Sequence, residues 1–257
     1  MFVLLDLDDT LLVEEDSAYR SFLAVARRLQ RRHPVDPEEF VTTARTCARE
    51  LWYSLPVHDY AKSIGIASHE ALWAEFSGES AMEKELRRHR DHYRIQTWIN
   101  ALARHGIRDD MLAAELSDLF REVRGAKHVL FDDAIPFLDR LRDLNAPMAL
   151  ISNGTPDLQR EKIGKSGIER YFRSIVISGE VGCRKPRREI FACCLERLGC
   201  AADQALMIGD RLDTDIKGAN DTRIMSVWLN RERKVNDSGI IPRHEIHSLL
   251  DAVPLCA

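Results

Sequence analysis

Near its start the chain reads Phe2-Val3-Leu4-Leu5-Asp6-Leu7-Asp8-Asp9-Thr10, a short apolar run that ends in acidic residues. An apolar run of this length is typical of a strand buried on both faces of a parallel sheet. In open sheets of this kind, ligands bind beyond the carboxyl ends of the strands. We therefore predict a first buried strand whose carboxyl end carries Asp6 and Asp8 to a binding site.

Beyond Gly125, apolar runs alternate with helical patterns. The apolar runs predict strands near 148–151, 174–177, 205–208 and 224–228. Helices are predicted between them, near 133–144, from Thr155 onward, near 188–198 ahead of Gly199, and briefly after Asp215. Strands that are separated by helices indicate the α/β class, with a doubly wound parallel sheet.

The segment 13–124 has a different pattern, because its apolar residues recur with the 3.6-residue period of amphipathic helices. The stretch Asp36-Pro37-Glu38-Glu39 is a typical helix start, with an N-cap residue followed by proline at the first helical position. No strand pattern interrupts the segment. We therefore predict an all-helical cap domain, 13–124, inserted into an α/β core that is formed by 1–12 and 125–257.

Two groups of side chains in this helical segment have a structural interpretation. The arginine-rich runs are expected to be solvated helix faces; they contain Arg27, Arg28, Arg31, Arg32, Arg87, Arg88, Arg90 and Arg94. Aromatic residues at helical spacing are expected in the core, namely Trp52, Trp73, Tyr93 and Trp98. Substrate selectivity is expected to lie in this segment, although no motif identifies its binding residues.

Composition indicates an ordinary globular protein. The 257 residues carry a net charge of −4, with 45% hydrophobic and 30% charged residues, so neither a nucleic acid nor an anionic membrane is an expected partner. No apolar run approaches the roughly 20 residues that cross a bilayer, and no signal-peptide pattern stands at the start, so we expect a cytoplasmic location. The six cysteines show no C-x-x-C pair and are expected to be free thiols.

Polar residues stand where four of the predicted core segments end. They are Asp6 and Asp8, then Ser152-Asn153, then Lys185-Pro186, and last Gly209-Asp210 with Asp213 and Asp215. Neighbouring parallel strands bring such groups to one rim. Two carboxylates about 4 Å apart repel by about 4 kcal/mol at an effective dielectric constant of 20, so Asp6, Asp8 and Asp210 need a cation. Hard oxygen ligands without histidine or thiolate favour Mg²⁺ over zinc.

A metal ion, a lysine and a serine hydroxyl form an environment for a dianionic phosphoryl group, whose transfer depends mainly on charge stabilisation. A carboxylate nucleophile would divide one difficult displacement into two easier ones through an aspartyl-phosphate. On chemistry alone, either Asp6 or Asp8 could be that nucleophile.

These four segments resemble the four motifs of the haloacid dehalogenase (HAD) superfamily, in the same order along the chain. The motifs are D-x-D-x-T, a hydroxyl residue, a lysine, and G-D-x-x-x-x-D. The helical block between the first two motifs resembles the members with a helical cap in that position. The resemblance implies the fold predicted above and a magnesium-dependent phosphohydrolase.

The resemblance also implies individual roles. Asp6 would be the nucleophile and a metal ligand, and Asp8 the general acid/base that lends its backbone carbonyl to the metal. Asp210 would be the third protein ligand. Lys185 would neutralise charge on the nucleophile and the phosphate. Phosphoryl oxygens would be held by Ser152 and the Asn153 backbone.

Some roles stay open at this point. Asp215 would support either the metal waters or Lys185, and the motif spacing favours it over Asp213, which is expected to cap a helix. Thr10 would make either a structural hydrogen bond or a substrate contact, and Asp9 is expected to be a capping or solvent-facing acid. Dehalogenases lack an aspartate at the position of Asp8, so its presence favours phosphatase activity.

We therefore expect a phosphatase that acts on a small phosphorylated metabolite. One alternative is a sugar phosphomutase of the same superfamily. Others are a phospho-accepting module that resembles response-regulator receivers, and a catalytically silent protein that binds a partner through its cap. The chain is expected to be a monomer or a homodimer.

Overall fold

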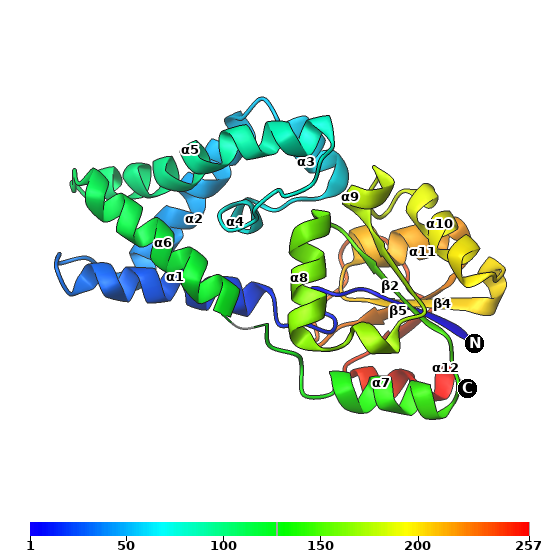
Figure 1. Ribbon diagram of the computed structural model, residues 1–257. Helices are drawn as coiled ribbons and strands as arrows, with labels where there is room; N and C mark the ends of the chain where they lie inside the picture. Colours follow the sequence, from blue (N-terminus) through cyan, green and yellow to red (C-terminus); the bar gives the residue numbers. More distant parts are fainter. Residues whose placement is uncertain (127, 257) are drawn as a thin grey trace. The chain divides into compact units, whose positions relative to one another are not determined.

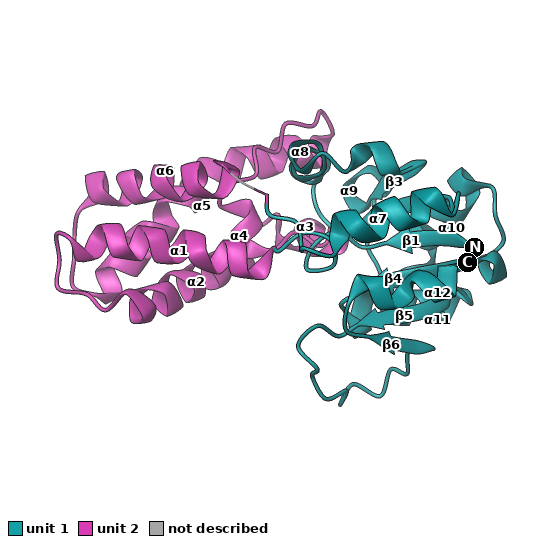
Figure 2. Cartoon of the chain, turned by 90° about the horizontal axis from the view of Figure 1, so that it is seen from below, with its two compact units in different colours: residues 1–13, 129–257 teal, residues 14–128 magenta. Residues whose placement is uncertain are grey.

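The structure, a computed structural model, describes residues 1–126 and 128–256. The chain divides into two compact units, which Figure 2 shows in different colours. One unit comprises Met1–Val13 and Val129–Ala257, and the other comprises Glu14–His128. The second unit is thus an insertion in the sequence of the first.

The first unit is built on a six-stranded sheet in the order β3-β2-β1-β4-β5-β6, with every neighbouring pair parallel. The strands are β1 (Phe2–Leu5), β2 (Met148–Ser152), β3 (Ser174–Ile177), β4 (Ala205–Gly209), β5 (Met225–Leu229) and β6 (His244–Ile246). The predicted α/β class and parallel sheet are confirmed. Sequence analysis missed β6, because this short edge strand is buried only at Ile246 and has no apolar run.

Side chains of β1 alternate between the two faces of the sheet, and each face has its own hydrophobic core. Val3 and Leu5 belong to the core beneath α7 (Ala134–Asp143), α8 (Pro156–Ser166) and α12 (Val253–Cys256). Leu4 belongs to the opposite core, beneath α10 (Arg188–Leu198) and α11 (Lys217–Thr222). Figure 1 shows α7 and α12 on one side of the sheet and α10 and α11 on the other. A sheet covered on both faces explains why its strands are continuously apolar.

The second unit is helical throughout the part that the structure describes. Its helices are α1 (Glu15–Gln30), α2 (Pro37–Ser54), α3 (His58–Ile64), α4 (Ser68–Ala71), α5 (Ala81–Arg104) and α6 (Asp110–Ala126). The predicted start of α2 is confirmed, because the Asp36 side chain accepts a 2.9 Å hydrogen bond from the Glu39 amide. Among residues 1–126 and 128–256, no helix is both long enough and apolar enough to cross a membrane.

Aromatic side chains form the centre of this helical unit. The rings of Phe22 and Phe120 lie 4.7 Å apart between their centroids, and the ring of Trp98 lies within 5.8 Å of both. The expectation of a core position is confirmed for the aromatic residues Trp52, Trp73, Tyr93 and Trp98, all of which are buried.

The expectation of solvated arginines is wrong for Arg94, which is 4% exposed. Its guanidinium donates to the carbonyl oxygen of Ala74 at 2.8 Å and to the carboxylate of Glu75 at 3.0 Å. Burial lowers the pKa of Arg94, although the charge of Glu75 opposes that effect. A charge run along one helix does not reveal such acceptors, because they come from a different part of the chain.

Candidate active site

The site lies at the carboxyl ends of three adjacent strands, β2, β1 and β4. Asp6 directly follows β1, Ser152 is the last residue of β2, and Asp210 directly follows β4. The amide of Asp6 donates to the carbonyl oxygen of Ile208 at 3.0 Å, which holds the end of β1 against β4. Because the three strands are adjacent and parallel, the residues that follow them meet at one edge of the sheet. All of these residues belong to the first unit.

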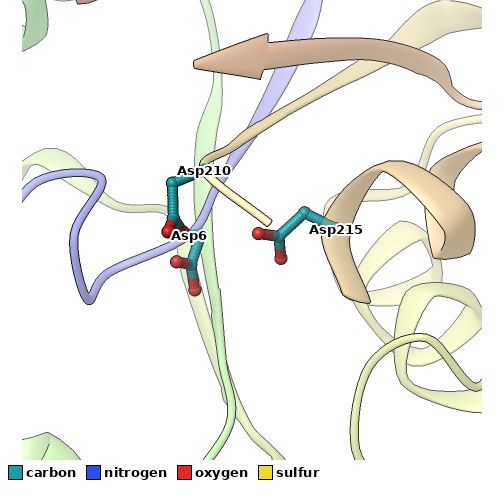
Figure 3. A group of neighbouring side chains, drawn as sticks. All are labelled: Asp6, Asp210 and Asp215. Atoms are coloured by element: carbon teal, nitrogen blue, oxygen red, sulfur yellow. The ribbon is translucent and has the colours of Figure 1, made fainter. Parts of the chain in front are cut away.

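Three carboxylates gather at this edge, and Figure 3 shows them facing one another. Asp6, Asp210 and Asp215 each offer an oxygen, and these oxygens lie within 4.8 Å of one another. Oδ1 of Asp210 is buried and has no hydrogen-bond partner among residues 1–126 and 128–256. Burial raises the pKa of Asp210 well above its usual value, and the charges of Asp6 and Asp215 raise it further. A cluster of buried carboxylate oxygens with an unsatisfied acceptor fits a hard divalent cation.

The cluster also depends on the glycine that precedes Asp210. A Cβ atom at Gly209 would lie 2.4 Å from the carboxyl group of Asp215. Real Cβ atoms do not approach other heavy atoms this closely, so any side chain at Gly209 would displace the Asp215 carboxylate from the cluster.

Lys185 places a positive charge beside the carboxylate cluster. Its ammonium lies 2.5 Å from Oδ1 of Asp6 and 2.7 Å from Oδ1 of Asp215. Burial alone would lower the pKa of Lys185, but the charges of Asp215 and Asp6 outweigh burial and raise it above its usual value. Burial also raises the pKa of Asp215 to about 6, despite the opposing charge of Lys185. The loop that carries Lys185 is anchored by Asn153, whose Oδ1 accepts a 2.9 Å hydrogen bond from the Lys185 amide.

The two acids that compete for the last motif position point in different directions. Asp215 is 1% exposed, and its Oδ2 accepts a 3.1 Å hydrogen bond from the Arg211 amide across the π-helical turn Leu212–Ile216. The side chain of Asp213 is 63% exposed and pairs with the Arg211 guanidinium at 2.8 Å. The structure therefore brings Asp215, and not Asp213, to the carboxylate cluster.

The turn after β1 places the remaining residues of the first motif. Thr10 is fully buried, and its hydroxyl donates to Oδ2 of Asp6 at 3.3 Å. Asp9 has a φ of 58°, and its amide donates to the carbonyl oxygen of Leu12 at 2.7 Å. Thr10 thus makes the structural contact, one of the two alternatives that the sequence left open, while Asp9 shapes the turn.

Two residues of the site were missed by sequence analysis, Gln159 and Lys162 of α8. Nε2 of Gln159 lies 2.8 Å from Oδ2 of Asp8, and Nζ of Lys162 lies 3.0 Å from Oδ1 of Asp8. Both side chains are fully buried. The available signal was that two polar residues three positions apart interrupt the apolar stripe of a helix that opens directly after the second motif.

Comparisons with known proteins agree with this architecture. Residues 2–221 match the model of the haloacid dehalogenase-like hydrolases. A phosphoserine phosphatase of Thermus thermophilus is 34% identical over 241 residues, which cover 93% of this chain and 92% of that protein. Pyrimidine 5'-nucleotidase YjjG of Escherichia coli is 28% identical over 184 residues, covering 71% of this chain and 76% of that protein.

Among solved structures, the HAD-hydrolase YfnB of Bacillus subtilis, described as bound to magnesium, aligns with a TM-score of 0.65 and 25% identity. The alignment covers 99% of this chain and 97% of that one. A 2-haloacid dehalogenase of Pseudomonas syringae aligns with a TM-score of 0.60 and 23% identity, and it shares the fold.

Together, the doubly wound sheet, the inserted helical unit and the acids at the strand ends define an α/β protein whose polar site lies at the carboxyl ends of parallel strands. The chain belongs to the family of haloacid dehalogenase-like hydrolases, as the match over residues 2–221 shows. Within that family it is a phosphohydrolase, like the phosphatases and the nucleotidase to which it is similar. The resemblance that rests on the four motifs is thereby confirmed.

Proposed function

We propose that this protein is a Mg²⁺-dependent phosphatase that hydrolyses a small phosphorylated metabolite through an aspartyl-phosphate on Asp6. The observation that carries the proposal is the surroundings of the Asp6 carboxylate. It is 6% exposed, and it lies beside the buried ammonium of Lys185 and within the carboxylate cluster. A desolvated carboxylate that is held beside fixed charges is suited to attack a phosphorus atom.

In the first step an oxygen of Asp6 forms a bond to phosphorus while the bond from phosphorus to the leaving oxygen breaks. Protonated Asp8 gives its proton to that leaving oxygen. In the second step Asp8, now a carboxylate, takes a proton from water as the water oxygen attacks phosphorus. The bond between Asp6 and phosphorus breaks, inorganic phosphate leaves, and Asp8 is again protonated.

The metal would be held by the carboxylates of Asp6 and Asp210 and by the backbone carbonyl of Asp8. A bound Mg²⁺ would offset the mutual repulsion of the acids and neutralise charge on the phosphoryl group. The unsatisfied oxygen of Asp210 supports this assignment, as does the magnesium in the related YfnB structure. Asp215 would act through Lys185, with which it is paired.

Phosphoryl oxygens would be held by the Ser152 hydroxyl, the Asn153 backbone and the Lys185 ammonium. Ser152 closes β2 beside β1, and the Asn153 side chain is used to anchor the Lys185 backbone. The helical unit would act as a cap that excludes water and selects the substrate. The relatives are named for phosphoserine, pyrimidine nucleotides and N-acylneuraminate 9-phosphate, which supports a small phosphomonoester as the substrate. The proposal includes a cytoplasmic location for the enzyme.

The test is release of inorganic phosphate from para-nitrophenyl phosphate, with Mg²⁺ and with EDTA. We expect Mg²⁺-dependent hydrolysis that Asp6→Asn abolishes, and a covalent phosphoenzyme in acid-quenched wild type but not in that variant. Asp213→Asn is the matched control, because it removes the same charge from a side chain that points away from the cluster. Activity that survives Asp6→Asn would exclude the proposed nucleophile. Isomerised sugar phosphate with little free phosphate would instead identify a phosphomutase.

A further inference from the structure

Two polar side chains of α8 are buried against the turn that follows β1. Lys162 and Gln159 are each 0% exposed, and they lie three residues apart on one face of the helix. Lysine is almost never fully buried unless it is paired, because an ammonium loses its hydration on burial. Asp8 lies beside it at 3.0 Å, and the side chain of Asp8 remains 23% exposed. The helix thus presents a buried cation to one oxygen of a partly accessible acid.

Gln159 contacts the other oxygen of the same carboxylate. Its amide nitrogen lies 2.8 Å from Oδ2 of Asp8 and 2.7 Å from the backbone oxygen of Asn153. Both of these atoms accept hydrogen bonds, so the two N–H groups of the amide have matching partners and its orientation is defined. The same nitrogen lies 2.7 Å from the hydroxyl of Ser152. Gln159 therefore joins the first motif to the second.

Space for this side chain depends on the residue that follows Asn153. A Cβ atom at Gly154 would lie 3.1 Å from Cγ, Cδ and Nε2 of Gln159. Gly154 also has a φ of +136°, a conformation that other residues rarely adopt. The glycine thus allows Gln159 to lie across the end of β2 and reach Asp8.

We propose that Lys162 and Gln159 are positioning residues that hold both oxygens of the Asp8 carboxylate and thereby fix its direction relative to Ser152. This inference rests on the proposed function, in which Asp8 transfers a proton in each step. The terminal torsion of an aspartate is broad and roughly two-fold, so a carboxylate without such contacts would sample several directions. Misplacement of a catalytic group by about 1 Å can cost about a hundredfold in rate.

A positioning role predicts a particular kinetic signature in Lys162→Met, which keeps most of the length of the side chain and removes its charge. Proton donation matters more for a poor leaving group than for a good one. We expect kcat/KM to fall about tenfold for para-nitrophenyl phosphate and about a hundredfold for phenyl phosphate. KM should change little, because neither residue is placed on the phosphoryl group.

The matched control is Lys165→Met, the same substitution on the same helix. The side chain of Lys165 is 51% exposed and pairs with Glu161 at 2.6 Å. This control should leave both kcat/KM values unchanged. Gln159→Leu is a second variant that removes the donor while retaining a similar volume, and we expect the same unequal loss on the two substrates. If Lys162→Met fails to fold, Gln159→Leu can be used for the same comparison of the two substrates.

A double substitution shows whether Lys162 acts through Asp8. If it does, Asp8→Asn with Lys162→Met should be no less active than Asp8→Asn alone, because the group being positioned is already lost. Equal losses on the two phosphates, or a further loss in the double variant, would overturn the inference.

A crystal structure of Lys162→Met adds a readout that does not require activity. In this variant the Asp8 carboxylate should adopt a different orientation from that in the wild type. An unchanged orientation of Asp8 would contradict the inference even if the wild type proved inactive. A wild type that releases no phosphate would overturn the proposed function alone. An active wild type in which Lys162→Met behaves like Lys165→Met would overturn the positioning role alone.

Discussion

The ammonium of Lys185 lies 2.7 Å from Oδ1 of Asp215, and both side chains are at least 98% buried. This pair connects the loop that carries Lys185 to the turn that follows β4. The pair also gives Asp215 a role that requires no direct contact with a metal. The Asp215 carboxylate holds Lys185, and Lys185 in turn contacts Asp6. Of the two supporting roles that the motif allows for Asp215, the pairing favours support of Lys185.

Asp215→Asn should therefore reduce activity through the lysine. Lys185 would keep its contact with Asp6 and lose its second anchor, so its ammonium would move relative to the phosphoryl group. We expect kcat/KM for para-nitrophenyl phosphate to fall about a hundredfold in saturating Mg²⁺. Steady-state kinetics of Asp215→Asn and Asp213→Asn test this prediction. Equal activity in the two variants would show that the pair has no catalytic consequence.

Asp210→Asn should change stability in opposite directions with and without metal. In EDTA the buried Oδ1 of Asp210 is unsatisfied, and burial, together with the charges of Asp6 and Asp215, raises the pKa of this carboxyl group. Removing the charge should raise the free energy of unfolding by about 1–2 kcal/mol. In the wild type, Mg²⁺ should stabilise the fold by binding the native state, and the variant should lose that gain.

Urea denaturation with EDTA and with Mg²⁺ measures both effects of Asp210→Asn. Asp213→Asn is the control, for which we expect less than about 0.5 kcal/mol of change and a normal response to Mg²⁺. A variant that is less stable than the wild type in EDTA would contradict the view that Asp210 is strained without a cation.

Asp133 should make stability depend on pH. Its carboxylate accepts two 2.9 Å hydrogen bonds from Arg231, one of 2.7 Å from the Ser248 hydroxyl and one of 2.9 Å from the Leu249 amide. Partial burial would raise the pKa of Asp133, but these hydrogen bonds outweigh burial and hold it below its usual value. The contribution of Asp133 is therefore complete above the pKa of the unfolded chain and is lost as the pH falls through the lowered native pKa.

Asp133→Asn should consequently lower the free energy of unfolding by about 2 kcal/mol at pH 7. The difference from the wild type should shrink toward zero as the pH falls below about 4, the usual pKa of an aspartate. Urea denaturation at a series of pH values tests this prediction, with Asp132→Asn as the control because that neighbouring side chain is exposed. A difference that is independent of pH would indicate a loss of packing instead of a loss of charge.

The aromatic centre of the helical unit should dominate its stability. Phe120 is fully buried against Phe22 and Trp98, so Phe120→Ala would leave a cavity. We expect the free energy of unfolding to fall by about 3–5 kcal/mol. Denaturation followed by tryptophan fluorescence measures the change. Met111→Ala on the same helix is the control, because Met111 is 85% exposed and should contribute less than about 0.5 kcal/mol.

Much of the architecture could be predicted because it depends on local patterns. Continuous apolar runs such as 148–151 and 205–208 are required wherever a strand is covered on both faces, and the helical period of 13–124 distinguishes the insertion. Because adjacent strands are parallel, the residues that follow them, such as Asp6 and Asp210, lie at the same edge of the sheet. The motif order and these strand ends therefore predict that Lys185 and the carboxylates of Asp6 and Asp210 come together.

Side-chain direction could not be predicted in the same way, because it depends on the exact backbone geometry of a turn and on which distant segment lies opposite. Asp213 and Asp215 are two residues apart, and only the π-helical turn directs one inward and the other outward. Arg94 is buried because Glu75 and a backbone carbonyl lie beside it.

The sequence alone determined the α/β class, the helical insertion and the chemical identity of the groups at the strand ends, since hydrophobic period and local motif carry that information. Only the tertiary structure decided that Lys162 and Gln159 face Asp8, because the phase of α8 relative to β1 arises from packing between segments more than 150 positions apart. The same packing holds Lys185 between Asp6 and Asp215, where burial strengthens the attraction between their charges.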